Sequence, residues 1–183
     1  GARAELAAAV AAKDDGWLVA WEDWRQTPPQ REAIWSILVG SDGRPAGAER
    51  QVTVPLDKPR AACAPAAVWN GTRFFVAYEQ PCSQVPNPLP SDLFGKWIAA
   101  DGAVDPTPAT IAGLAGAETS PQLARGAGSR VLVVWRDQSA GEVIRGGVLD
   151  DRATGLTGNA VALASGAGTR ESPALAVAPS GGG

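Results

Sequence analysis

The sequence predicts an all-β fold, built as an array of four-stranded antiparallel sheets. Three observations lead to this prediction. Short apolar segments recur at a fixed spacing, and the segments between them lack helical periodicity. The 183 residues also include 22 Gly and 15 Pro, a content that predicts frequent turns and few long helices.

The apolar segments are three five-residue runs, at 17–21, 74–78 and 131–135. Each run ends in an aromatic residue, and Trp21, Tyr78 and Trp135 follow one another at a step of 57 residues. A short apolar run without alternation indicates a strand that is covered on both faces. Its β-branched and aromatic content favours a strand over a helix. The spacing therefore predicts a repeat of about 57 residues.

A further strand is expected before the second and third runs, at 64–68 and 120–124, and again at 172–177, where the partial fourth copy begins. Asn70-Gly71 is the pairing that a tight hairpin turn requires, and it lies between the predicted strand and the second run. In the first copy, residues 4–12 have helical propensity. Their position in the repeat favours a strand, and a strand is our prediction.

Each run is followed by a loop of variable length and by two more strands. The predicted third strands are 34–39, 93–98 and 144–149, and the predicted fourth strands are 51–54, 109–111 and 160–163. Asp42-Gly43 and Asp101-Gly102 predict turns after the first two of the third strands. Four antiparallel strands in a unit of this length are typical of a β-propeller blade. A single blade buries neither face adequately, so blades are expected to stack.

The chain is interpreted as a single repeat domain, 1–183, with about three and a fraction copies. The boundaries are about 4–56, 63–113 and 119–165, with a partial fourth copy at about 171–183. Three and a fraction blades cannot close a ring, since propellers have four or more. We therefore expect self-association or a longer parent chain to complete the array. A first residue other than Met also indicates a processed product or a fragment.

At these residues the sequence resembles repeats of secreted bacterial proteins. In those repeats a YLVVW-D-R strand is followed by DIYG-RV---DG; here the corresponding segments are Trp21-Glu22-Asp23 after its run, and 92–102. The resemblance covers nearly the whole chain and implies a β-propeller of exported or surface proteins. The sequence departs from the pattern at Gln80, which replaces the Asp, and at Arg145-Gly146-Gly147. These departures argue against one strictly repeated ligand or metal site per blade.

Composition excludes several classes of function. The net charge is −3 and no basic block is present, so nucleic-acid binding is not expected. No apolar run approaches the 18 or more residues of a membrane span. The sequence contains no His, which removes Ser-His-Asp and Cys-His catalysis and His-ligated zinc. No metal or other cofactor is expected.

The only two cysteines are Cys63 and Cys82. They form either a disulfide or two buried free thiols. A hairpin centred on Asn70-Gly71 brings the two cysteines together, so we predict the disulfide. A disulfide implies an oxidising compartment, and the predicted location is extracellular, at the cell surface or periplasmic.

Four of the seven tryptophans are predicted to be core residues by their place in the repeat: Trp17, Trp21, Trp97 and Trp135. Trp35 is expected to be partly exposed. Trp24 and Trp69 fall outside the repeated columns, which makes them candidates for ligand contact. Asn70-Gly71-Thr72 fits a glycosylation acceptor, but the hairpin turn explains the same residues.

Acidic residues follow the apolar runs or lie in the loops after them. They are Glu22, Asp23, Glu79, Asp92, Asp137 and Glu142. Asp23 and Asp92 are candidate ligand-binding residues, since paired carboxylates serve glycoside hydrolysis or calcium binding. The alternative that we prefer is a solvated polar rim that ends the apolar strands. No catalytic residue is assigned.

These observations favour a non-catalytic extracellular or cell-surface module for binding or assembly. It would recognise a glycan or a protein through the variable loops near 24–33, 81–92 and 138–142. Two alternatives remain open: a fragment of a glycoside-hydrolase-like propeller enzyme, and a structural subunit of a surface filament or coat. The lack of His and of any compact catalytic motif favours the binding module over the enzyme.

Overall fold

The computed structural model describes residues 7–23, 33–53, 61–82, 90–113, 115–139, 141–166 and 173–175. Within these ranges the chain forms twelve β-strands and no helix. The strands make three sheets of four antiparallel strands, each in simple chain order. The predicted all-β class and the four-stranded antiparallel unit are confirmed.

The first sheet consists of β1 (Ala8–Lys13), β2 (Gly16–Asp23), β3 (Ala33–Gly40) and β4 (Arg50–Gln51). The second sheet consists of β5 (Cys63–Trp69), β6 (Arg73–Gln80), β7 (Asp92–Ala99) and β8 (Ala109–Ala112). The third sheet consists of β9 (Glu118–Arg125), β10 (Val131–Asp137), β11 (Val143–Leu149) and β12 (Val161–Ala164).

The segment with helical propensity is a strand. β1 pairs with β2 without interruption from Ala8 opposite Trp21 to Lys13 opposite Gly16. Pairing against an apolar strand decides this conformation, since alanine propensity is only a weak preference. The strand predicted at 172–177 lies mostly outside the described residues, and 173–175 carry no strand. The strand predicted at 51–54 is only two residues long, and Val54 is outside the described part.

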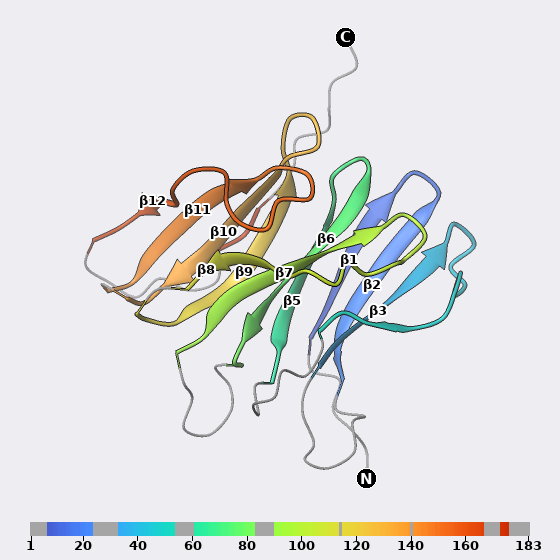
Figure 1. The fold of residues 1–183 in the computed structure, drawn as a ribbon, viewed down its shortest axis with the longest axis horizontal. Coiled ribbons are helices and arrows are strands. Elements are labelled where there is room, and N and C mark those ends of the chain that lie inside the picture. The colour runs from blue at the N-terminus through green and yellow to red at the C-terminus, as the bar shows by residue number, and fades with distance from the viewer. Residues whose placement is uncertain are drawn as a thin grey trace.

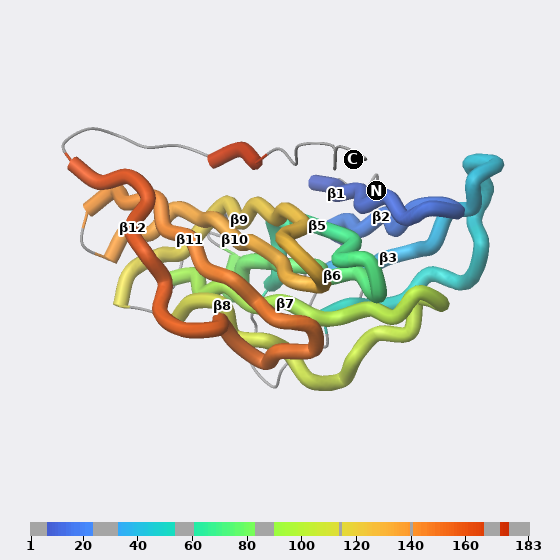
Figure 2. Tube along the Cα trace, turned by 90° about the horizontal axis from the view of Figure 1, so that it is seen from above, coloured from blue at the N-terminus to red at the C-terminus, as the bar shows by residue number. Residues whose placement is uncertain are grey.

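The three sheets stack face to face, with the first sheet at the right of Figure 1, the second in the middle and the third at the left. Their first strands contact one another, β1 beside β5 and β5 beside β9, along one side of the molecule (Figure 2). We call the face of a sheet toward the preceding sheet its front and the face toward the following sheet its rear. The front of the first sheet and the rear of the third therefore lie at the two ends of the array.

One apolar core fills the space between the first two sheets. The rear of the first sheet supplies Ala11, Leu18, Ala20, Ile34 and Val52. The front of the second sheet supplies Phe74, Val76, Tyr78 and Ile98, with Trp69 packed at the edge. The side chains of successive residues in a strand point to opposite faces, which is why Phe74 belongs to this core and Phe75 does not.

A second apolar core fills the space between the second and third sheets. The rear of the second sheet supplies Val68, Phe75, Ala77, Leu93, Trp97 and Ile111. The front of the third sheet supplies Val131, Val133, Trp135 and Leu149. The predictions that Trp97 and Trp135 are core residues are confirmed, since both are almost wholly buried.

The prediction that Trp17 is a core residue is wrong. Its side chain is 36% exposed. Trp21, on the same face, is also a predicted core residue but is only partly buried. Trp35 on that face is partly exposed, as predicted. These residues lie on the front of the first sheet, and neither of the other two described sheets covers that face. Phe74 and Val131, at the corresponding positions of the other sheets, are fully buried.

The hairpin turn at Asn70 links the second and third sheets. Asn70 Nδ2 donates to the Ser129 carbonyl oxygen at 2.8 Å and to Asp151 Oδ1 at 3.1 Å. Its Oδ1 accepts hydrogen bonds from the backbone N–H groups of Thr72 and Arg73 at 2.9 Å. The Asn70 side chain is therefore fully buried and hydrogen-bonded, and the turn explains the Asn-Gly-Thr sequence without a glycan.

Close packing in the second core requires a glycine at 95. A Cβ atom placed on Gly95 would lie 2.2 Å from Phe75 Cζ. We expect Gly95→Ala to lower the free energy of unfolding by about 1–3 kcal/mol, since the Phe75 ring must leave its rotamer or shift the backbone. Chemical denaturation measures this change. Gly47→Ala is the control, because nothing lies within 4 Å of its Cβ position; equal effects of the two substitutions would contradict the packing.

Candidate functional site

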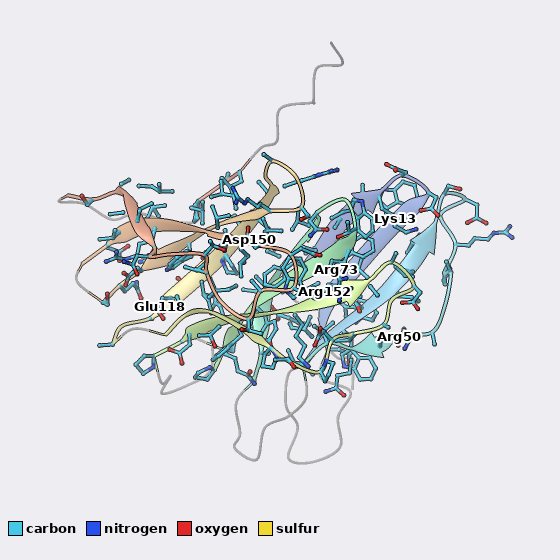
Figure 3. The ribbon with its side chains drawn as sticks, turned by 45° about the horizontal axis from the view of Figure 1, so that its top comes forward. Lys13, Arg50, Arg73, Glu118, Asp150 and Arg152 are labelled. Carbon is cyan, nitrogen blue, oxygen red and sulfur yellow. A yellow bond between two sulfur atoms is a disulfide. The ribbon has the colours of Figure 1, made fainter. Side chains whose placement is uncertain are left out.

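The acidic residues gather at one end of the sheets. The pairing places Asp23 opposite Ala33, Gln80 opposite Asp92 and Asp137 opposite Val143. The second strands therefore end, and the third strands begin, at the same end of all three sheets, which we call the acidic end. Glu118 is paired with Asp137 and lies at this end too. Arg73 begins β6 at the opposite end of the strands, which we call the hairpin end, and Figure 3 shows Arg73 and Arg152 away from Glu118.

Two of the acidic residues connect neighbouring sheets. Glu22 Oε1 accepts a hydrogen bond of 2.7 Å from the backbone N–H of Ala64, at the start of β5. Glu79 Oε1 accepts one of 2.9 Å from the backbone N–H of Ser120, at the start of β9. The same connection thus joins the first sheet to the second and the second to the third. Both glutamates are almost wholly buried.

A bulge in the receiving strand presents the N–H group. Ala64 and Ser120 have φ values of 51° and 55°, in the left-handed region that non-glycine residues seldom adopt. Each precedes a proline, and the pairing with the second strand shifts by one residue at that point. A bulge leaves its extra residue outside the ladder. The N–H is therefore available to the glutamate of the preceding sheet.

Burial affects the charge of Glu22. Loss of water around the carboxylate raises the pKa of Glu22 above its ordinary value of 4.5, and the nearby Glu79 carboxylate raises it further. The hydrogen bond from the Ala64 N–H opposes this shift but does not cancel it. Burial is the larger of the two causes, so the junction disfavours the charged form of Glu22 relative to a carboxyl group in water.

The third sheet breaks the pattern. Arg136 occupies the position that corresponds to Glu22 and Glu79, and a guanidinium cannot accept a hydrogen bond. Its Nε donates to Glu142 Oε2 at 2.6 Å, within the same sheet. The third sheet therefore lacks the glutamate connection to a following sheet.

Asp137, at the end of β10, is fully buried and held by its own sheet. Its Oδ1 accepts a hydrogen bond of 2.7 Å from the Ser139 backbone N–H, and its Oδ2 pairs with the Arg145 guanidinium. Burial by itself would raise the pKa of Asp137. The hydrogen bonds from Ser139 and Arg145 together outweigh burial and hold the pKa below its ordinary value of 3.8.

The expectation of a solvated rim is therefore wrong for Glu22, Glu79 and Asp137. These side chains are buried, and hydrogen bonds from the neighbouring sheet or from their own sheet compensate for the lost water. A signal for the connection is present in the sequence. Glutamate follows the terminal aromatic in two copies, and a residue followed by proline comes 42 or 41 positions later, at Ala64 and Ser120.

The ligand-binding candidates fall at different places. Asp23 and Asp92 both lie at the acidic end; Asp23 is buried and accepts a hydrogen bond of 3.2 Å from Trp21 Nε1, whereas Asp92 is half-buried. Trp69 lies at the opposite, hairpin end, and its ring packs on Phe74 with centroids 4.6 Å apart. Trp24 is outside the described residues. Trp69 and Asp92 therefore cannot form one site.

The disulfide closes the acidic end of the second sheet. Cys63 and Cys82 are bonded, which confirms the predicted pairing. Cys63 begins β5 and Cys82 follows β6, so the bond joins the two open ends of one hairpin. Both cysteines are buried, beside the Glu79 side chain. The bond fixes the point from which the loop between β6 and β7 leaves the sheet.

In the described ranges, no group of three or more His, Cys, Asp and Glu side chains has an arrangement that could hold a metal ion. Among the same residues, no helix has the length and apolar character to cross a membrane.

Comparisons with known proteins add no assignment, because no protein-family model and no curated protein matches this chain.

The raised pKa of Glu22 predicts how stability depends on pH. A group with a raised folded-state pKa contributes stability that is complete below its unfolded value, here 4.5, and that is lost as the pH rises through the folded pKa. Glu22→Gln keeps an oxygen for the Ala64 N–H and removes the titration. We expect the variant to gain stability relative to the parent as the pH rises from 4 to 7, measured by denaturation at each pH.

Asp137→Asn provides a comparison of opposite sign. The lowered pKa of Asp137 means that its contribution is present above pH 3.8 and is lost as the pH falls further. The amide loses the charged partner of Arg145, so we expect a loss of about 2 kcal/mol at neutral pH. The difference from the parent should shrink below pH 3.8 in the same titration. A loss independent of pH would contradict the assigned hydrogen bonds.

Proposed function

We propose that this chain is a non-catalytic binding and assembly module on a β-propeller-like scaffold that acts outside the cytoplasm. The observation that carries the proposal is that the buried carboxylates at the acidic end hold the scaffold together. These carboxylates receive hydrogen bonds from backbone or guanidinium groups of the scaffold, as Glu22, Glu79 and Asp137 do.

The stacking of the sheets supports the propeller-like scaffold. A propeller places four-stranded antiparallel blades side by side around a central channel. The three sheets likewise meet face to face, with their first strands gathered on one side. The glutamate connections support it further, because they repeat between successive sheets at corresponding positions.

Recognition belongs, in this proposal, to the loops at the acidic end. The loops near 24–33 and 81–92 lie largely outside the described residues, but their attachment points are fixed. Asp23 and Ala33 are paired in the first sheet, and the disulfide holds Cys82 in the second. A rigid sheet that carries long loops is a common arrangement for binding sites. Trp24 and Asp92 are the residues that we assign to ligand contact.

The disulfide supports a location outside the cytoplasm, because such bonds persist in oxidising compartments.

A glycan array and a hydrolysis assay on the same glycan panel test this proposal. We expect binding without hydrolysis, and a loss of at least about tenfold in affinity for Trp24→Ala, which corresponds to about 1.4 kcal/mol. Trp69→Ala is the matched control: its ring packs on Phe74, so this variant should lose stability and keep its affinity. Hydrolysis that Asp92→Asn abolishes would overturn the proposal in favour of a glycosidase.

A further inference from the structure

We propose that the front of the first sheet and the rear of the third sheet are two halves of one interface, through which a second copy of this chain docks head to tail. This inference rests on the proposed assembly role and names its partner. The fronts of the second and third sheets are covered by a preceding sheet, whereas no described sheet covers the front of the first. The rears of the first and second sheets are covered by a following sheet, whereas no described sheet covers the rear of the third.

The front of the first sheet is apolar across three strands and open. Its residues are Ala8, Val10 and Ala12 on β1, Trp17, Val19 and Trp21 on β2, and Trp35, Ile37 and Val39 on β3. Val10 is 59% exposed and Trp17 is 36% exposed. In the second sheet, Phe74 and Val76 take the positions of Trp17 and Val19 and are fully buried against the first sheet. Within the chain, such a front is therefore covered by the rear of the preceding sheet.

The rear of the third sheet is open along its fourth strand, where Val161 and Leu163 are exposed, whereas Val134 on its second strand is buried. Its fourth strand places Leu163 over Gly146, whose Cβ position lies 2.8 Å from Leu163 Cδ1. Val52 and Ile111 hold the corresponding position next to the third strand of their own sheets, and they are buried by the following sheet. Leu163 is 56% exposed. Within the chain, such a rear is covered by the front of the following sheet.

Each copy thus carries one front and one rear that none of its described sheets covers. At both junctions within the chain, the rear of one sheet packs on the front of the next. The open front therefore fits a rear, and the open rear fits a front. A second copy supplies both. This contact joins two different surfaces, so it is heterologous, and such contacts close into rings or extend into fibres. Two copies supply six sheets, which is within the usual range of four to eight blades.

The glutamate connection supports the same pairing. A glutamate at 136 would be buried at the new junction, where it would need a bulge N–H from the sheet in front of it. β1 pairs with β2 without a register shift, and in the described part of β1 no residue has the left-handed conformation of Ala64 and Ser120. The third sheet carries Arg136 at that position, already paired with Glu142. The rear of the third sheet therefore lacks the glutamate, and the front of the first sheet lacks the bulge N–H that would bind it. Docking of these two faces leaves no buried carboxylate without a donor at this position.

Sedimentation velocity and light scattering of the complete chain from about 1 to about 100 μM test the inference. We expect a species of twice the 18.7 kDa protomer mass. Val10→Asp on the front and Leu163→Asp on the rear should each weaken self-association at least about 100-fold, because each places an unpaired carboxylate in an apolar contact. Both residues are more than half exposed, so both variants should fold; circular dichroism checks this.

Ala103→Asp is the matched control, since it adds the same charge to an exposed turn of the second sheet. Mixing the two interface variants separates the possible arrangements. In a head-to-tail contact each variant retains the face that the other has lost, so the equimolar mixture should associate more strongly than either variant alone. Wild-type behaviour of Leu163→Asp would mean a front-to-front contact and would overturn the inference.

A strictly monomeric chain at the highest concentration would also overturn it, and glycan binding by that monomer would leave the proposed function standing. Self-association through these faces without binding to any glycan or protein would instead support the inference and count against the recognition role.

Discussion

Burial of apolar sheet faces against neighbouring sheets is the interaction on which the rest of this structure depends. Phe74 and Phe75 are consecutive residues of β6 and both are fully buried, one in each core. This is possible only for a strand that is covered on both sides. Burial of apolar surface contributes about 25 cal/mol per Å², and a four-stranded sheet alone buries neither face. Each sheet therefore depends on its neighbours for stability.

The polar connections follow from this stacking. Once two sheets are in contact, any polar group near the junction loses water and requires a partner. Glu22 and Glu79 find theirs in the bulge N–H groups of the next sheet, and Asn70 connects the hairpin end of the second sheet to the third. An apolar contact by itself fixes the relative orientation of two sheets only weakly, and these directional hydrogen bonds fix it further. They define which end of one sheet meets which end of the next.

The same dependence gives the outer faces their importance. A face that carries the exposed Val10 and Trp17 and the partly buried Trp21 is costly in water, and apolar patches of this kind mark contact surfaces. The scaffold also explains why its own carboxylates are poor candidates for catalysis. They hold backbone and guanidinium groups in place, which is why the proposed recognition role is assigned to the loops at the acidic end.

The sequence by itself determined the all-β class, the positions of most strands, the Asp-Gly and Asn-Gly turns and the disulfide. These features depend on local chemistry: turn residues, runs of β-branched and aromatic residues, and a hairpin that brings Cys63 to Cys82. The strand at β1 also followed from the sequence, through its place in the predicted repeat. Only the tertiary structure decided that Trp17 is exposed while Phe74 is buried, and that Glu22 and Glu79 connect sheets instead of facing water. The physical reason is that burial and hydrogen-bond partners depend on which sheet lies against which, and residues far apart in the chain supply that neighbour.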